Sequence, residues 1–244
     1  MDPINRRTIL GLAVAGSLLQ ITPQLAAAAP TTPDYGSGRL GDWTTMGFSV
    51  SPDPFVNAAI AKGVWMFGDS IAMRGQRDLA VRLSTERGQT LAVNHWAGRP
   101  TIPTVNELEK WIIRYGALPR QIVMAVGSND IFNPPVMAAQ IVRTMGLVAG
   151  RAEVYWMDVQ VSRRKSTAAI QIADQRNSGW VNSQIHNAVP RYQNLHLVPW
   201  FLAFASSPPR LTAYLEDGVH PNTTTGMRFH SAVVLANVPA PAPA

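Results

Sequence analysis

The stretch GVWMFGDSIAMRG, Gly63–Gly75, passes from an apolar run to a polar turn within a few residues. The run Val64–Phe67 is typical of a strand that is buried on both faces of a parallel sheet. Gly68 permits a turn after this strand, and the turn presents Asp69 and Ser70. Both residues are good N-cap types, so one interpretation is that they only begin a helix. The other interpretation is that Ser70 carries chemistry at the end of the strand.

Short apolar runs recur along the chain and alternate with helical patterns. This alternation predicts right-handed β-α-β crossovers and a parallel sheet that helices cover on both faces. Ligands bind such sheets beyond the carboxyl ends of the strands, which is where Ser70 is expected. The five expected strands are Val64–Phe67, Leu91–Val93, Ile122–Val126, Val154–Val161 and Leu195–Val198.

Two of the expected helices have recognisable ends. One should begin with a capping box formed by Thr104 and Glu107 and should stop at Gly116. The last helix should begin after Asn222, a favourable N-cap, and should turn Val233–Leu235 inward.

The composition is that of one domain with one sizeable core: 244 residues, of which 46% are hydrophobic. The net charge is +6, but only 15% of the residues are charged, so nucleic-acid binding is not expected. The run SRRK, Ser162–Lys165, is interpreted as a solvated loop or helix start. The net positive charge favours attraction to an anionic envelope or an acidic glycan. Cysteine is absent, which excludes disulfides, thiolate nucleophiles and cysteine-ligated metals.

Residues 1–29 have the features of an export signal. An arginine pair, Arg6–Arg7, precedes the apolar run Ile9–Leu19, and small residues follow at Ala26–Ala29. The pair is similar to that of a twin-arginine signal, and a signal for the unfolded-chain route is the alternative. The apolar run is too short to span a bilayer, so we expect cleavage near Ala28 or Ala29 and a secreted or extracytoplasmic protein.

The rest of the chain divides into three parts. Residues 30–53 are rich in Pro, Gly, Ser and Thr and are expected to form an extended lead-in. The main domain is expected over residues 54–238. The low-complexity tail, residues 239–244, is expected to be disordered.

Three other polar segments come next to strand ends or before the last helix, and the topology brings them to the same edge as Ser70. They are NHWAGRPT (94–101), AVGSNDIFNPP (125–135) and LEDGVHPN (215–222). A nucleophilic serine needs a base, and the base needs a group that orients it. His220 is the candidate base, with Asp217 as its orienting acid. The candidate oxyanion donors are the backbone N–H groups of Ser70 and Gly98 and the side-chain amide of Asn129.

These four segments, in this order, resemble the motifs of the SGNH hydrolase superfamily, also called GDSL esterases and lipases. Ser70, Gly98, Asn129 and His220 match the four motif letters, and the resemblance covers Gly63–Val234. It implies a three-layer α/β/α sandwich of flavodoxin type with the five-stranded parallel sheet. It also implies a Ser-His-Asp triad, a three-donor oxyanion hole, and no metal or organic cofactor.

A structural role is the alternative for several candidates. Gly98 and Asn129 are also ordinary turn residues, and Asp217 is also an ordinary surface turn residue. Asp130 is expected to brace its loop. His95 and Arg99 flank Gly98 and have either a substrate contact or a structural role. The remaining histidines are expected to be structural or exposed: His186, His196 and His230.

The reaction that the candidates predict is carboxylic ester hydrolysis through an acyl-enzyme, with short acyl chains favoured. Segments 154–164 and 177–188, with the Gly98-Arg99 pair, are loosely similar to the SGNH domains of envelope polysaccharide O-acyltransferases. The expected substrate is therefore a small-molecule or glycan-linked ester. An O-acetyl esterase or O-acyltransferase acting on envelope glycans is one alternative, and a non-catalytic binding module with the same fold is the other.

Overall fold

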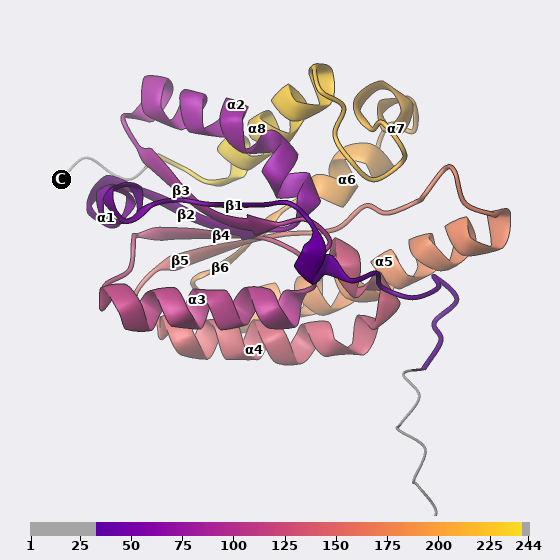
Figure 1. Cartoon of the computed structure of the whole chain (residues 1–244), viewed down its shortest axis with the longest axis horizontal. Coiled ribbons are helices and arrows are strands. Elements are labelled where there is room, and N and C mark those ends of the chain that lie inside the picture. The colour runs from indigo at the N-terminus through magenta and orange to yellow at the C-terminus, as the bar shows by residue number, and fades with distance from the viewer. Residues whose placement is uncertain (1–32, 241–244) are drawn as a thin grey trace, which may run out of the picture. The chain divides into compact units, whose positions relative to one another are not determined.

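The structure is a computed structural model, and it describes residues 33–240. A six-stranded sheet lies between two layers of helices (Figure 1). The strand order is β1-β3-β2-β4-β5-β6, in which β1 is antiparallel to β3 and every other pair is parallel. The strands are β1 (Phe48–Val50), β2 (Gly63–Gly68), β3 (Thr90–Trp96), β4 (Gln121–Ala125), β5 (Glu153–Met157) and β6 (Leu195–Val198). The predicted α/β/α sandwich with five parallel strands is confirmed, with one further strand.

One helical layer contains α2 and α8, which pack side by side, together with the short helices α6 and α7 (Figure 1). These helices are α2 (Ser70–Arg87), α6 (Trp200–Ala205), α7 (Pro209–Tyr214) and α8 (Thr225–Asn237). The opposite face is covered by α1 (Asp53–Lys62), α3 (Thr101–Tyr115), α4 (Met137–Val148) and α5 (Ala168–Ala188). Short 3-10 helices complete the described chain: η1 (Trp43–Thr45), η2 (Ser128–Phe132), η3 (Pro134–Val136) and η4 (Val189–Arg191).

Strand β2 supplies both hydrophobic cores because its side chains alternate between the faces of the sheet. Val64 and Met66 enter the core beneath α2 and α8, whereas Trp65 and Phe67 enter the core beneath α3. All six residues of β2 are buried, as the continuous apolar run predicts. Trp111 of α3 packs edge-on against Trp65, with 5.2 Å between the ring centroids. This central strand therefore fixes where its carboxyl end, and so Ser70, can lie.

The expected lead-in contains η1 and β1, two elements that no sequence pattern predicted. Phe48 of β1 lies opposite Trp96 of β3, and the two rings pack with their centroids 4.8 Å apart. A strand of three residues is too short to show a period of two in its sequence. It is identified only by its pairing with β3. The predicted signal, residues 1–29, and the last four residues of the predicted tail lie outside the described residues.

The predicted start of α3 is wrong by one turn. The helix begins at Thr101, and the Thr104 hydroxyl donates to the Pro100 carbonyl (2.9 Å) instead of capping the helix. The reason is a contact from elsewhere in the chain: Asp130 accepts the backbone N–H of Thr101 (3.0 Å). The stop at Gly116 is confirmed, with φ at +65°.

Other boundaries follow the sequence with small shifts. The predicted strand 154–161 leaves the sheet after Met157, because Val159 pairs instead with the side-chain amide of Asn182 on α5. Asn222 caps the last helix from two residues ahead of Thr224, accepting the Gly226 N–H (2.8 Å). No helix within residues 33–240 combines the length and apolar character needed to cross a membrane.

Replacement of Trp65 by alanine should lower the free energy of unfolding by about 3–5 kcal/mol, because it removes a fully buried ring from an aromatic cluster. Urea unfolding followed by circular dichroism measures this loss. Ile113→Ala, at a side chain that is 76% exposed on α3, is the matched control and should change stability by under about 0.5 kcal/mol. Equal effects of the two substitutions would contradict the packing described for β2.

Candidate active site

The turn between β2 and α2 has no room for a side chain at Gly68. A Cβ there would lie 2.4 Å from the Ala72 Cβ and 2.9 Å from the Ala125 carbonyl oxygen. Asp69 follows as the N-cap of α2, and its carboxylate accepts the Ile71 N–H (2.9 Å). Asp69 therefore performs the capping, while Ser70 stands at the first helical position with its hydroxyl free for another partner.

Ser70, His220 and Asp217 form one chain of hydrogen bonds. The Ser70 Oγ lies 2.8 Å from the His220 Nε2, and the His220 Nδ1 lies 2.8 Å from an oxygen of Asp217. With the proton on Nδ1, the imidazole donates to the carboxylate and its Nε2 accepts from the serine hydroxyl. The structure thus brings Ser70 to His220, which lies 150 positions later in the sequence, and places Asp217 behind the imidazole, in the order that acid–base activation of a serine requires.

The loop that carries His220 and Asp217, residues 215–221, is closed on itself; we call it the His220 loop. Leu215 and Pro221 form a β-bridge, and the Glu216 N–H donates to the His220 carbonyl (2.8 Å). The second carboxylate oxygen of Asp217 accepts the backbone N–H of His220 (2.9 Å). Asp217 therefore fixes the backbone of its own loop as well as the imidazole.

Asp217 is held as an anion. Burial alone would raise its pKa, but the backbone and side-chain hydrogen bonds from His220, with the attraction of the imidazolium, outweigh burial and lower the pKa to about 2. A negative charge in this position beside Nδ1 is the arrangement that orients an imidazole acting as a base.

The His220 loop is also tied to α2 by Arg74, which is not among the predicted site residues. Arg74 forms an ion pair with Glu216 and donates to the Pro221 carbonyl (3.3 Å). The sequence feature that points to Arg74 is its spacing from Ser70. It lies four residues later and so projects from the same side of the helix.

Gly98 lies in the turn after β3, and that turn requires glycine. Its φ is +73°, and a Cβ would lie 2.7 Å from the sulfur of Met46 and 3.1 Å from the Cβ of Trp43. Among residues 33–240, neither the Gly98 N–H nor the Ser70 N–H donates to another group. Both N–H groups are therefore available to a bound anion.

Asn129, the third candidate donor, contacts residues adjacent to the other two. It is part of η2, which we call the Asn129 loop, and its amide nitrogen contacts the Asp69 carboxylate (3.3 Å) and the Arg99 carbonyl (3.4 Å). These partners are the immediate neighbours of Ser70 and Gly98. Both contacts are long, so the amide can turn towards a stronger acceptor at small cost.

Asp130 braces the Asn129 loop, as expected. Its carboxylate accepts both the backbone N–H and the hydroxyl of Thr101, at 3.0 Å and 2.6 Å. Arg99 is only 1% exposed and donates to the side chain and the carbonyl of Asn94, so its role is structural. His95 is fully buried against Gln76, and burial lowers its pKa to about 3, which also indicates a structural role.

The three remaining histidines lie away from the Ser70–His220–Asp217 chain. His186 contacts the buried Asp158 (3.2 Å), and His196 pairs with Glu153 (2.5 Å). His230 is fully buried, and burial lowers its pKa to about 4. These positions agree with structural or exposed histidines.

SRRK lies in a loop, as one of the two interpretations predicted, but its first arginine is only partly solvated. Arg163 makes a two-bonded ion pair with Asp174, whose side chain is fully buried. The pair is not visible in the sequence because Asp174 looks like an ordinary polar residue of an exposed helix.

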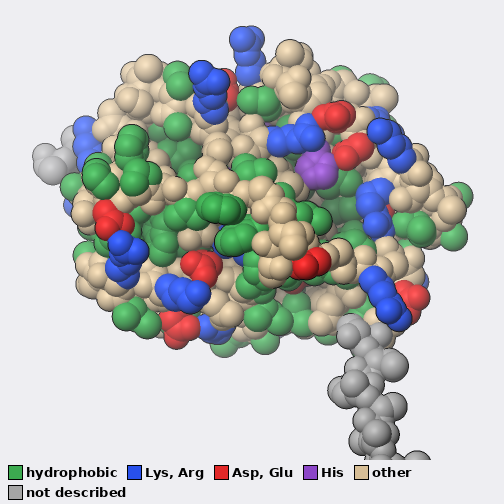
Figure 2. Space-filling view, viewed as in Figure 1, with side chains coloured by type: hydrophobic (Ala, Val, Ile, Leu, Met, Phe, Trp, Pro, Cys, Tyr) green, Lys and Arg blue, Asp and Glu red, His purple; other side chains and the backbone are tan. Residues whose placement is uncertain are grey.

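Figure 2 shows one face of the domain, on which basic, acidic and apolar side chains are interspersed.

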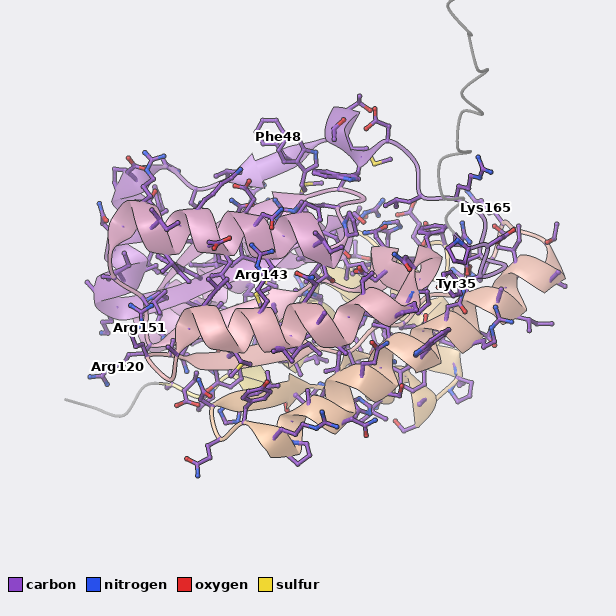
Figure 3. The ribbon with its side chains drawn as sticks, turned by 90° about the horizontal axis from the view of Figure 1, so that it is seen from below. Tyr35, Phe48, Arg120, Arg143, Arg151 and Lys165 are labelled. Carbon is purple, nitrogen blue, oxygen red and sulfur yellow. The ribbon has the colours of Figure 1, made fainter. Side chains whose placement is uncertain are left out.

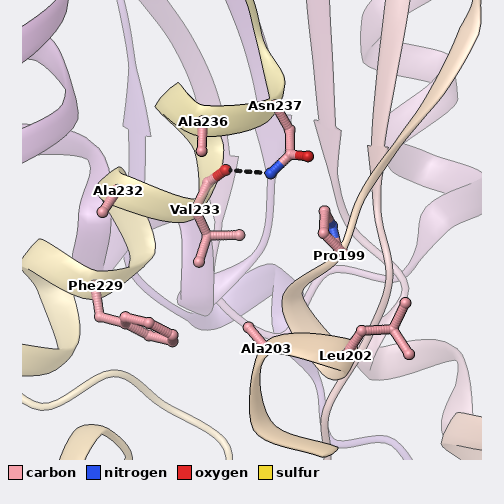
Figure 4. A pocket seen from close by; sticks show the side chains of 8 residues that line it. All are labelled: Pro199, Leu202, Ala203, Phe229, Ala232, Val233, Ala236 and Asn237. Carbon is pink, nitrogen blue, oxygen red and sulfur yellow. Dashed lines mark hydrogen bonds between the residues drawn. The ribbon is translucent and has the colours of Figure 1, made fainter. Parts of the chain in front are cut away.

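An apolar groove of about 550 Å³ lies between α6 and α8 (Figure 4). It is lined by Pro199, Leu202, Ala203, Phe229, Ala232, Val233, Ala236 and Asn237. None of these lining residues is Ser70, Gly98, Asn129, Asp217 or His220.

No protein-family model and no curated sequence matches the chain, and the likenesses found are between folds. The C-terminal catalytic domain of a Streptococcus pneumoniae peptidoglycan O-acetyltransferase, with a methylsulfonyl adduct, has 16% identity and a TM-score of 0.55, covering 72% of this chain and 92% of that one. A GDSL-like lipase from Bacteroides thetaiotaomicron has 17% identity and a TM-score of 0.56, and the match covers 76% of this chain and 89% of the lipase. An acetyl xylan esterase has 16% identity and a TM-score of 0.56, and the match covers 72% of this chain and 100% of the esterase. The chain has the fold of the SGNH hydrolases.

Two buried carboxyl groups behind Ser70 hold their protons to unusually high pH. Burial, with a smaller contribution from the nearby charge of Asp69, raises the pKa of Asp130 to about 7 despite the hydrogen bonds from Thr101. Burial likewise raises the pKa of Asp69 to about 6. The unfolded chain releases such protons near pH 4, so between about pH 4 and pH 7 the folded state binds more protons at Asp130 than the unfolded state. Stability from this group therefore falls as pH rises through that window.

Asp130→Asn should remove this dependence, because the amide keeps an acceptor for Thr101 but cannot ionise. Between about pH 5 and pH 8 the free energy of unfolding of the variant should rise relative to the natural protein by roughly 2 kcal/mol. Urea unfolding at several pH values measures the difference. Asp34→Asn, at an exposed position, is the control and should show no such trend. A constant difference between Asp130→Asn and the natural protein would contradict the raised pKa.

Proposed function

We propose that this protein is a serine esterase that hydrolyses carboxylic esters with short acyl chains. The observation that carries the proposal is the hydrogen-bonded chain from Ser70 through His220 to Asp217, with 2.8 Å at both steps. A serine hydroxyl becomes an effective nucleophile when such a base removes its proton during attack. The two free N–H groups and the Asn129 amide beside Ser70 support stabilisation of an oxyanion.

The first half-reaction transfers the acyl group to the protein. The Ser70 Oγ attacks the ester carbonyl carbon while His220 takes the hydroxyl proton at Nε2. The charge on the tetrahedral oxygen is stabilised by the N–H groups of Ser70 and Gly98 and by the amide of Asn129. The bond from carbon to the alcohol oxygen then breaks, and His220 gives its proton to the departing alcohol.

The second half-reaction releases the acid. Water attacks the acyl carbon of the ester on Ser70, and His220 takes a proton from that water. The tetrahedral intermediate collapses, the bond from carbon to the Ser70 Oγ breaks, and His220 returns the proton to the serine. Asp217 stays ionised throughout and stabilises the imidazolium formed in each half-reaction.

Hydrolysis of p-nitrophenyl acetate, butyrate and octanoate by the protein without residues 1–29 tests this function. We expect acetate and butyrate to be hydrolysed faster than octanoate. Ser70→Ala should abolish nearly all turnover, and Asn129→Ala should lower kcat by about 100-fold or more. Retention of full activity in Ser70→Ala would falsify the mechanism. A preference for octanoate would instead contradict the short-chain assignment.

Acetylated envelope glycans are the proposed natural substrate class. Two proteins with this fold are described as a peptidoglycan O-acetyltransferase and an acetyl xylan esterase, which supports the acetyl group as the acyl part. The net charge of +6 supports attraction to an anionic envelope. Release of acetate from O-acetylated peptidoglycan or xylan, compared with Ser70→Ala, separates glycan substrates from simple esters.

Export is part of the same proposal, because an envelope substrate lies outside the cytoplasm. The Arg6–Arg7 pair and the small residues at Ala26–Ala29 support a cleaved signal. The intact mass of the secreted protein should correspond to a chain that begins near Ala29, and replacement of both arginines by lysine should retain the protein in the cell. An intracellular protein of full mass from the natural sequence would contradict export.

A further inference from the structure

The segment Ser162–Arg164 touches the His220 loop along its backbone. The Ser162 N–H donates to the Gly218 carbonyl (3.2 Å), and the Arg164 N–H donates to the Asp217 carbonyl (2.9 Å). The Arg164 guanidinium also donates to the Leu215 carbonyl (2.5 Å). At Gly218, with φ at +91°, a Cβ would lie 1.9 Å from the Ser162 carbonyl oxygen, so the two backbones are in close contact. The position of Asp217 therefore follows the position of this segment.

Arg163, in the middle of the segment, faces the other way. Its guanidinium donates to both carboxylate oxygens of Asp174 on α5, at 2.8 Å and 2.6 Å. It also lies over the ring of Phe132, with 5.2 Å from its central carbon to the ring centroid. Phe132 is the last residue of the Asn129 loop, so Arg163 contacts the loop that supplies the candidate oxyanion amide.

Helix α5 contacts both the segment Ser162–Arg164 and the Asn129 loop. Asp174 holds Arg163, and Asn177, one turn further along the helix, donates to the Ile131 carbonyl of the Asn129 loop (2.9 Å). Asp174 is completely buried, and a two-bonded arginine–carboxylate pair has a fixed relative geometry. The buried ion pair between Arg163 and Asp174 thus fixes the position of the segment beside Asp217 relative to the loop that carries Asn129.

We infer that Arg163 is a positioning residue for the proposed reaction: anchored on Asp174, it sets the distance between the His220 loop and the Asn129 loop. This inference rests on the proposed function. Base and oxyanion donor act on the same tetrahedral centre, so a displacement of one loop relative to the other lowers the rate. Arg163 touches neither the substrate nor the reacting atoms, and its effect passes through Phe132 and Arg164.

Steady-state hydrolysis of p-nitrophenyl acetate tests this role. Arg163→Ala should lower kcat by about 10-fold or more with little change in KM, because the loss falls on the transition state. Arg163→Lys keeps the charge but loses the planar fork, so its kcat should be intermediate.

Two controls separate positioning from loss of a surface charge. Lys165→Ala removes a positive charge next to the segment, and Arg151→Ala removes an arginine whose guanidinium donates to carbonyls at the end of α4. Figure 3 places Lys165 and Arg151 at opposite ends of the domain. Both controls should keep kcat within about twofold of the natural protein.

A double-mutant cycle separates positioning from general destabilisation. If Arg163 acts through the Asn129 loop, then Arg163→Ala should lower kcat by a much smaller factor in an Asn129→Ala background than in the natural protein. The reason is that the donor it would misplace is already missing there. An equal fold-loss in both backgrounds, or an unchanged kcat in folded Arg163→Ala, would overturn the inference.

If Arg163→Ala does not fold, Phe132→Leu tests the same link while leaving the ion pair with Asp174 intact. It should lower kcat by about threefold in the natural background and should have no effect in the Asn129→Ala background. An equal effect in both backgrounds would again overturn the inference. Failure of the natural protein to hydrolyse the ester, or activity in Ser70→Ala, would instead overturn the proposed function, and the inference with it.

Discussion

The arrangement depends on the turn from β2 to α2 at Gly68, where a strand buried on both faces stops and a helix begins. Because a Cβ at Gly68 would lie 2.4 Å from the Ala72 Cβ, the helix packs directly over the end of the strand. Asp69 satisfies the Ile71 N–H, so the Ser70 hydroxyl can pair with His220 at the carboxyl edge of the sheet, and the Ser70 N–H has no acceptor among residues 33–240. The core under Trp65 and Phe67 holds the strand, and so the serine, in place.

A polar network extends this constraint to the rest of the site. Asn129 reaches the neighbours of both Ser70 and Gly98, while Asp130 ties the Asn129 loop to the start of α3. On the other side, Asp217 fixes its own loop before it orients His220. Asn129 and His220 are thus each held by neighbouring polar groups, which is the preorganisation that an electrostatically stabilised reaction needs. Buried carboxyl groups with raised pKa values accompany this arrangement.

Sequence predicts those parts of the molecule that rest on local pattern. The five parallel strands have apolar runs, and the three-residue spacing of Asp217 and His220 already lies within one loop. The sequence does not reveal contacts that depend on distant partners. Strand β1 has three residues and no visible period, α3 begins early because Asp130 accepts the Thr101 N–H, and Arg163 is paired with a buried Asp174. The topology brings Gly98 and Asn129 to one edge of the sheet, but only the structure gives their distances.

The most direct measurement of the central claim is reaction of the folded protein with a serine-directed fluorophosphonate, followed by peptide mapping. Because only an activated serine reacts, the account predicts one adduct per chain, located on Ser70, and no adduct in Ser70→Ala. His220→Ala should slow the labelling strongly, since the hydroxyl then lacks its base. Absence of labelling in the folded natural protein, or an adduct at another serine, would contradict the account. Absence of labelling would favour a binding module that keeps the fold without the reaction.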